Sequence, residues 1–138
     1  MKTGIIIRIY PMVMTGVMLM LTISCKKDFQ VNPFPATVCY YQPIVNTVET
    51  SNITRNSAVS GGEIISAGSS AVTAQGICWS DDGTVPTTSG AHVADSSGSK
   101  NFNITMKGLK PKTYYIVRAY ATNYYGTGYG TGMSFTTQ

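Results

Sequence analysis

The residues of this chain that could act as acids, bases or nucleophiles are few and widely spaced. The sequence has one histidine, His92, in a polar stretch between apolar segments. Hydrolytic and transfer sites place a nucleophile, a base and an orienting group within hydrogen-bond reach of one another. The sequence indicates no such grouping around its six carboxylates, which are Asp28, Glu49, Glu63, Asp81, Asp82 and Asp95. We therefore expect no catalytic residues, and the sequence predicts a protein that is not an enzyme.

Two short patterns could in principle hold an ion or a phosphate. Asp81 and Asp82 begin a turn that could bind a hard cation weakly, but a calcium loop normally supplies more oxygen ligands, which favours a solvated turn. The Gly-rich stretch 126–132 lacks the spacing of a dinucleotide-binding loop and precedes an expected strand instead of opening a helix. The sequence therefore predicts no metal and no cofactor.

The first 24 residues have the organisation of an export signal. Lys2 and Arg8 form a positively charged start, and residues 9–24 then run for sixteen residues without a charge. A membrane-spanning helix needs roughly twenty apolar residues, and Pro11 and Gly16 make this stretch less suited to a permanent span. A charged start followed by a short apolar core is typical of a cleaved signal peptide.

The end of this segment points to lipid attachment. Residues 21–25, LTISC, resemble the lipobox of bacterial lipoproteins, and the following KKD looks like lipoproteins of the Bacteroidetes phylum. The resemblance implies that residues 1–24 are removed and that Cys25 becomes an acylated N-terminus, whose several acyl chains bind a membrane stably. It also implies an outer-membrane lipoprotein of the cell envelope that faces either the surface or the periplasm. An ordinary secretory signal, or an uncleaved anchor with an incidental cysteine, is the alternative.

Residues 25–42 are expected to form a lipidated tether. Pro33 and Pro35 favour an extended path. The aromatic residues of this segment, Phe34, Tyr40 and Tyr41, either dock on the following domain or lie at the lipid interface.

The three cysteines are Cys25, Cys39 and Cys78. If Cys25 carries lipid, an oxidising compartment would permit a disulfide between Cys39 and Cys78. Two separate thiols are the alternative.

From residue 43 onward the pattern changes to short segments of period two separated by turns. Seven such segments without helical periodicity predict an all-β, immunoglobulin-like sandwich of two sheets over residues 43–138. The expected strands cover residues 43–50, 57–66, 71–80, 91–95, 101–106, 113–123 and 129–137.

The strands over 71–80 and 113–123 predict a packing arrangement on the outer face of one sheet. Tyr120 and Arg118 project from the second strand, beside small outer-face residues of the first, Gly76 and Cys78. Large rings can lie over small neighbours across such a pair, and Arg118 could stack on a tyrosine ring. This would be a structural use of residues that resemble a site.

Residues 109–115, LKPKTYY, resemble the start of strand F in fibronectin type III domains, and the resemblance extends over residues 43–138. It implies a fibronectin type III-like β-sandwich in which Tyr115 is the tyrosine corner, with a hydroxyl that bonds to nearby backbone.

The resemblance also implies a contact loop between the last two strands, in which Tyr124, Tyr125 and Tyr129 are the candidate binding residues. Rigid aromatic rings among Gly and small polar residues are typical of binding loops. Ordinary turn chemistry is the alternative, with Asn123, Gly126 and Tyr129 serving as framework.

Charge and location together restrict the partner. The formal net charge is +4, and removal of Lys2 and Arg8 leaves 4 − 2 = +2. Nucleic-acid binding needs a denser basic face than the remaining lysines provide, so it is not expected. We expect attachment to a membrane through acyl chains on Cys25 and a protein or glycan ligand for a binding or adhesion module. The alternative is a passive spacer or accessory subunit of an envelope complex, such as a polysaccharide-handling system.

Overall fold

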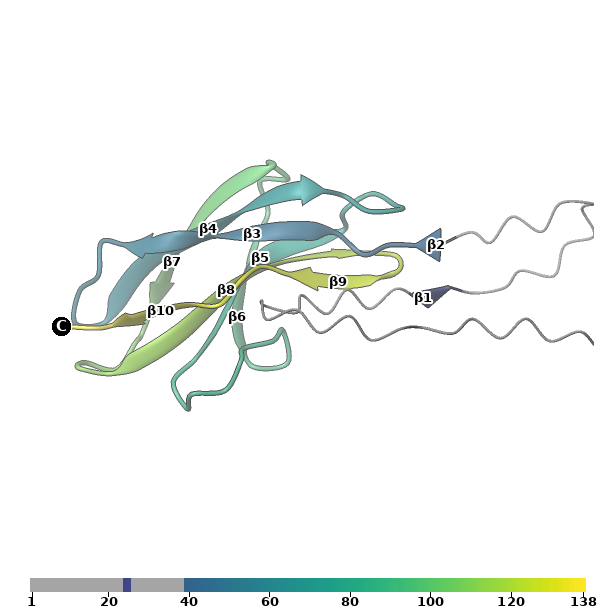
Figure 1. Cartoon of the computed structure of the whole chain (residues 1–138). Coiled ribbons are helices and arrows are strands. Elements are labelled where there is room, and N and C mark those ends of the chain that lie inside the picture. The colour runs from purple at the N-terminus through teal and green to yellow at the C-terminus, as the bar shows by residue number, and fades with distance from the viewer. Residues whose placement is uncertain (1–23, 26–38) are drawn as a thin grey trace, which may run out of the picture.

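The computed structural model describes residues 24–25 and 39–138, and the predicted signal peptide and most of the tether (residues 1–23 and 26–38) lie outside this range. In the described residues no helix that could span a membrane is found. The strands in Figure 1 are β1 (Ser24–Cys25), β2 (Cys39–Tyr40), β3 (Ile44–Ser51), β4 (Ser57–Ser66), β5 (Ala74–Ser80), β6 (Ala91–Asp95), β7 (Asn101–Lys107), β8 (Tyr114–Asn123), β9 (Gly126–Tyr129) and β10 (Met133–Thr136).

Two antiparallel sheets pack face to face and confirm the predicted all-β sandwich. One sheet has the order β3-β4-β7, and the other has the order β10-β8-β5-β6, with β9 also paired to β8. A short separate ladder joins β1 to β2, with Ser24 opposite Tyr40 and Cys25 opposite Cys39.

The period-two pattern of residues 113–123 matches the inner face of β8. On β8, Tyr115, Val117, Ala119 and Ala121 are buried, as alternation places them on one face of the strand. The burial of these apolar side chains from both sheets is the main source of stability. The core consists of Val45, Ala58, Ile64, Ile77, Phe102, Ile104, Met106, Leu109, Tyr115, Val117, Ala119, Ala121 and Phe135.

Of the last predicted strand, 129–137, the structure keeps β10, and residue 129 ends a further strand, β9, which begins at Gly126 inside the predicted loop; the two strands are separated by residues 130–132. Gly130 lies at the break because a Cβ there would collide with Oγ1 of Thr47 on β3. Thr47 Oγ1 accepts a hydrogen bond from the Ala119 backbone N–H on β8 at 3.0 Å. Thr47, a residue of the opposite sheet, therefore takes the place beside Ala119 that a continuous β9–β10 strand would have occupied.

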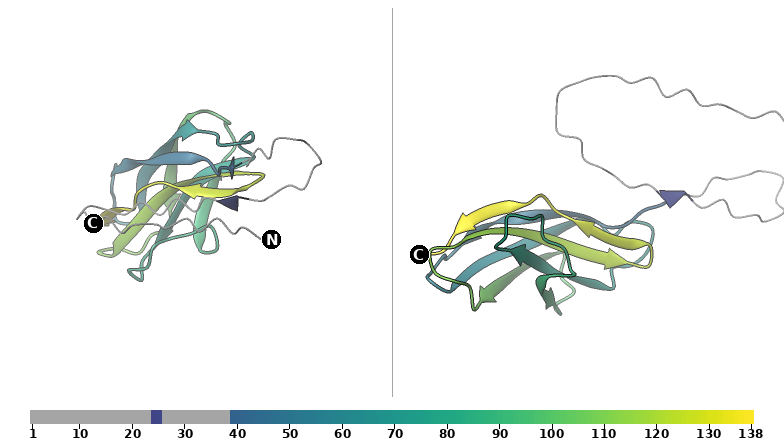
Figure 2. Two further views of the ribbon diagram at one scale, coloured as in Figure 1. Left: turned by 45° about the vertical axis from the view of Figure 1, so that its right-hand side comes forward. Right: turned by 90° about the horizontal axis from the view of Figure 1, so that it is seen from below.

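The sandwich has two ends that differ in their residues. Both views in Figure 2 show them at opposite ends of the molecule. We call the end that holds residues 39–42, 67–73 and 124–125 the N-terminal pole; there the Tyr41 carbonyl accepts a hydrogen bond from the Ser69 N–H. The C-terminal pole holds residues 52–56, 108–113 and the chain end, where Gln138 N–H donates to the Thr54 carbonyl.

Candidate functional site

The tyrosine turn joins β8 to β9 through two residues, Tyr124 and Tyr125. Asn123 and Gly126 are the last paired residues of the hairpin. Asn123 Oδ1 accepts hydrogen bonds from the N–H groups of Tyr125 (2.8 Å) and Gly126 (3.1 Å). Gly126 has φ +147°, a backbone conformation that favours glycine. The turn is therefore held rigidly by its flanking residues while its two rings point outward.

Asn123 also ties the turn to two distant parts of the chain. Its Nδ2 donates to the carbonyls of Tyr41 and Ala67, both at 2.9 Å. The side chain is only 4% exposed. Asn123 thus serves as framework, which was one of the two alternatives that the sequence left open.

Four tyrosines gather at the N-terminal pole, and we call them the polar-end tyrosines: Tyr40, Tyr41, Tyr124 and Tyr125. The Tyr40 ring stacks on Tyr125 with centroids 4.4 Å apart and planes 13° apart, and Tyr124 meets Tyr125 edge-on at 5.2 Å. Tyr124 is 84% exposed, Tyr41 44% and Tyr125 41%. The sequence named the docking of Tyr40 as one alternative, but only the fold shows that Tyr125 is its partner.

Tyr129 does not share this surface. It lies on β9 opposite Tyr120, three residue pairs from the turn. Its hydroxyl accepts a hydrogen bond from the Thr88 N–H at 3.2 Å, and the Arg118 guanidinium carbon lies 4.8 Å from its ring centroid. Arg118 Nε donates in turn to the Gly130 carbonyl at 2.8 Å. The structure therefore assigns Tyr129 to sheet packing and reduces the candidate binding loop to Tyr124 and Tyr125.

The outer face of β5 and β8 has the packing that the sequence predicted. Tyr120 lies opposite Gly76, and Arg118 lies opposite Cys78. A Cβ on Gly76 would lie 2.9 Å from Tyr120 Cε1, so the ring occupies the space that the missing side chain leaves.

Tyr115 lies inside the sandwich with its ring stacked on Phe135 at a centroid distance of 5.5 Å. Its hydroxyl accepts a hydrogen bond from the Lys110 backbone N–H at 2.9 Å. This is the bond that a tyrosine corner makes to backbone a few residues upstream.

The predicted pairing of Cys39 with Cys78 is absent from the structure. Cys39 and Cys78 both lie in the described part of the chain, and no disulfide joins them. Cys78 is buried in the middle of β5, where its thiol donates to the Arg118 carbonyl at 3.6 Å and burial raises its pKa to about 11. Cys39 lies beyond the sheet, on β2. A Cys39–Cys78 disulfide would require one of these strands to move, and the structure contains no such bond.

The titratable groups that opened the sequence argument serve local structure. His92 Nδ1–H donates to the Gly90 carbonyl at 2.9 Å. The Thr84 hydroxyl and N–H lower the pKa of Asp82, and hydrogen bonds from Ser97 and Gln75 lower the pKa of Asp95. Asp81 forms an ion pair with Lys110 at 2.7 Å. Among the described residues, no three His, Cys, Asp or Glu side chains are grouped to hold a metal ion.

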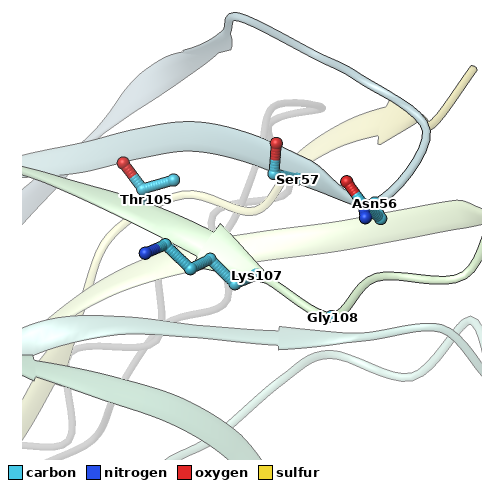
Figure 3. A pocket seen from close by; sticks show the side chains of 5 residues that line it. All are labelled: Asn56, Ser57, Thr105, Lys107 and Gly108. Atoms are coloured by element: carbon cyan, nitrogen blue, oxygen red, sulfur yellow. The ribbon is translucent and has the colours of Figure 1, made fainter.

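Figure 3 shows a hollow on the outer face of β4 and β7, with a volume of about 290 Å³. Its lining offers hydroxyl, amide and ammonium groups but neither an aromatic ring nor a carboxylate. It therefore has no pair of groups for acid–base chemistry and no platform for stacking a ligand. The lining residues are Asn56, Ser57, Thr105, Lys107 and Gly108.

Comparison with known proteins defines the fold. No family model matches the sequence, and no curated protein matches it. Among solved structures, domains A168–A170 of titin match with a TM-score of 0.54 and 19% identity over 71% of this chain and 33% of theirs. The chicken CNTN1 FN1–FN3 domains match with a TM-score of 0.56 and 16% identity over 77% of this chain and 38% of theirs.

A third similar structure comes from a bacterium. The sensor domain of the anti-sigma factor RsgI4 in Pseudobacteroides cellulosolvens matches with a TM-score of 0.50 and 17% identity, over 69% of this chain and 93% of that chain. The present chain spans about a third of the titin and chicken chains. At these identities the likeness shows the fold alone, which is that of the fibronectin type III and immunoglobulin-like β-sandwiches.

Proposed function

We propose that this chain is a lipid-anchored module of the cell envelope that binds a partner and catalyses no reaction. The observation that carries the proposal is the tyrosine turn. Tyr124 is 84% exposed on a turn that Asn123 holds rigidly, so its ring offers a large contact area at little cost in conformational entropy. Lipid attachment at Cys25 is supported by the sequence pattern of residues 21–25.

A second candidate function, a spacer or accessory subunit of an envelope complex, is favoured by the place of the turn. Tyr125 stacks on Tyr40 of the same chain, and the turn lies at the pole where the tether reaches the sandwich. Part of the aromatic surface is therefore occupied by the chain itself.

Membrane fractionation followed by protease treatment of intact cells tests the proposal. Wild type should partition with the outer membrane and incorporate labelled fatty acid, and Cys25→Ala should incorporate none, because it has no thiol at position 25 to acylate. Cys39→Ala is the matched control and should stay bound and labelled. Fatty-acid labelling of Cys25→Ala would contradict lipid attachment at this residue.

The protease step separates the two candidate functions. Cleavage of the anchored protein in intact cells would place the sandwich on the surface and favour a binding or adhesion role. Protection would place it in the periplasm and favour the accessory subunit.

A further inference from the structure

The two tyrosines of the turn, Tyr124 and Tyr125, differ from Tyr115 and Tyr129 in how their hydroxyls are used. The hydroxyls of Tyr115 and Tyr129 are both hydrogen-bonded to backbone N–H groups. Those of Tyr124 and Tyr125 make no hydrogen bond within the described part of the chain, although their rings are fixed by stacking. An exposed ring with a free hydroxyl suits a boundary where one side is apolar and the other wet.

The backbone places the candidate lipidation residue beside these rings. Cys25, the first residue of the proposed mature chain, lies directly opposite Cys39 in the β1–β2 ladder, and Cys39 directly precedes Tyr40. Residues opposite each other in an antiparallel pair have Cα atoms about 4.5–5.5 Å apart. Acyl chains attached at residue 25 would therefore start next to the N-terminal pole, and Figure 1 shows β1 and β2 at that end of the sandwich.

The segments that carry the polar-end tyrosines differ in charge from the C-terminal pole. These segments and the neighbouring turn, with sequences CYYQ, YY and AGSSAVT, contain no charged residue, whereas the adjacent β6–β7 region has Asp95 in one hollow with Val72 and Thr73, and Lys100 bonded through its carbonyl to Ile64. The C-terminal pole carries Arg55, Lys110 and Lys112. Burial of a charge against lipid is costly, so these three segments can approach a bilayer without that cost, while the C-terminal pole stays in water.

From these three observations we infer that the partner of the polar-end tyrosines is the headgroup layer of the membrane that holds Cys25. Tyrosine is enriched at membrane–water interfaces because its ring and hydroxyl match the two sides of that layer. The sandwich then stands on its N-terminal pole, with the C-terminal pole directed away from the bilayer. This inference rests on the proposed lipid anchoring and names the partner of the same surface.

Fluorescence of the mature, lipidated chain in vesicles of phosphatidylethanolamine and phosphatidylglycerol tests the inference. The chain has one tryptophan, Trp79, so Trp79→Phe supplies a silent background. In it, Tyr124→Trp reports on the N-terminal pole and Tyr114→Trp, at a 51% exposed position near the C-terminal pole, is the matched control. Brominated acyl chains should quench most of the Tyr124→Trp emission and shift it to the blue, and aqueous iodide should not reach it. The Tyr114→Trp control should show the reverse.

Equal iodide quenching of the two variants, with no bromine effect, would overturn the inference while flotation with the vesicles still supported anchoring. Shielding of Tyr124→Trp in native membranes but not in pure lipid vesicles would also overturn it, in favour of a protein or glycan. If the purified chain carries no acyl group, the anchoring proposal and this inference fail together.

A second measurement avoids the dependence on the Trp79→Phe background, because Trp79 packs against the core and its replacement can disturb folding. Hydroxyl-radical footprinting of the unchanged chain should show that vesicles protect Tyr124 and Tyr125 and leave Tyr114 as reactive as in detergent. Equal reactivity of Tyr124 on vesicles and in solution would again overturn the inference.

Discussion

At the scale of single residues, Asn123 connects three parts of the chain that are distant in sequence. Its amide accepts two hydrogen bonds from the turn and donates to carbonyls 56 and 82 residues away. Since the side chain is buried, its removal would leave several backbone groups without partners, and an unpaired buried group costs more than an average hydrogen bond contributes.

We predict that Asn123→Ala lowers the free energy of unfolding by about 2–6 kcal/mol, the sum of four such bonds at their usual net values. Urea denaturation followed by Trp79 fluorescence measures the change. Asn103→Ala, at an exposed position on β7, is the control and should stay within about 0.5 kcal/mol of wild type. A loss below about 1 kcal/mol for Asn123→Ala would show that water replaces these contacts.

At the scale of elements, β5 shows why a strand can require glycine in its interior. Gly76 is paired on both sides, to Ala94 of β6 and to Tyr120 of β8. A Cβ at this position would collide with the Val93 carbonyl and would lie 2.9 Å from Ala94 Cα. The small residue therefore allows both neighbouring strands and the Tyr120 ring to approach.

We expect Gly76→Ala to destabilise the protein by about 1–3 kcal/mol, the usual cost of overpacking, because the atoms in the way are largely backbone. Thermal unfolding measures the effect. The control is Gly90→Ala, where the new Cβ would meet only the Thr87 carbonyl at an ordinary 3.7 Å. Equal melting temperatures for the two variants would mean that β6 can move away from β5 at little cost.

At the scale of the whole molecule, Thr47 links the two sheets by a hydrogen bond instead of by apolar contact. Its hydroxyl on β3 accepts from the Ala119 N–H on β8, 72 residues away. Ala119 lies where β9 has ended and β10 has not begun, so its N–H would otherwise be buried without a strand partner. This bond fixes β3 against the broken edge of the larger sheet.

Thr47→Val preserves the shape of this side chain and removes the acceptor. It should cost about 1–3 kcal/mol, since a buried N–H group loses its partner. Thr105→Val, on the exposed face of β7, should change the free energy of unfolding by less than about 0.5 kcal/mol. Native-state hydrogen exchange at Ala119 gives a second readout, and unchanged protection there in Thr47→Val would contradict the proposed role of the bond.

The sequence by itself determined the features that depend on local chemistry. The alternation on β8 reports which residues face the core, because successive side chains of a strand point to opposite faces. The small residues Gly76 and Cys78 likewise predicted where large rings would lie. The sequence pattern before Cys25 is a local motif as well, and it predicts acylation of that residue.

The tertiary structure alone decided which residues meet across long stretches of chain. Alternation along β3 can predict that the Thr47 side chain faces inward. Its position at the gap between β9 and β10 depends on how the two sheets cross. That gap is also why the last strand is broken, a feature that period-two alternation does not reveal.

Tyr129 was grouped with the turn because it is close in sequence, yet the pleat of β9 places its ring on the sheet, where the Arg118 guanidinium lies over it. The polar-end tyrosines form one surface because hydrogen bonds from Asn123 and Ser69 hold Tyr41 beside the turn. Pairings of this kind follow from packing of the whole sandwich, which no local pattern encodes.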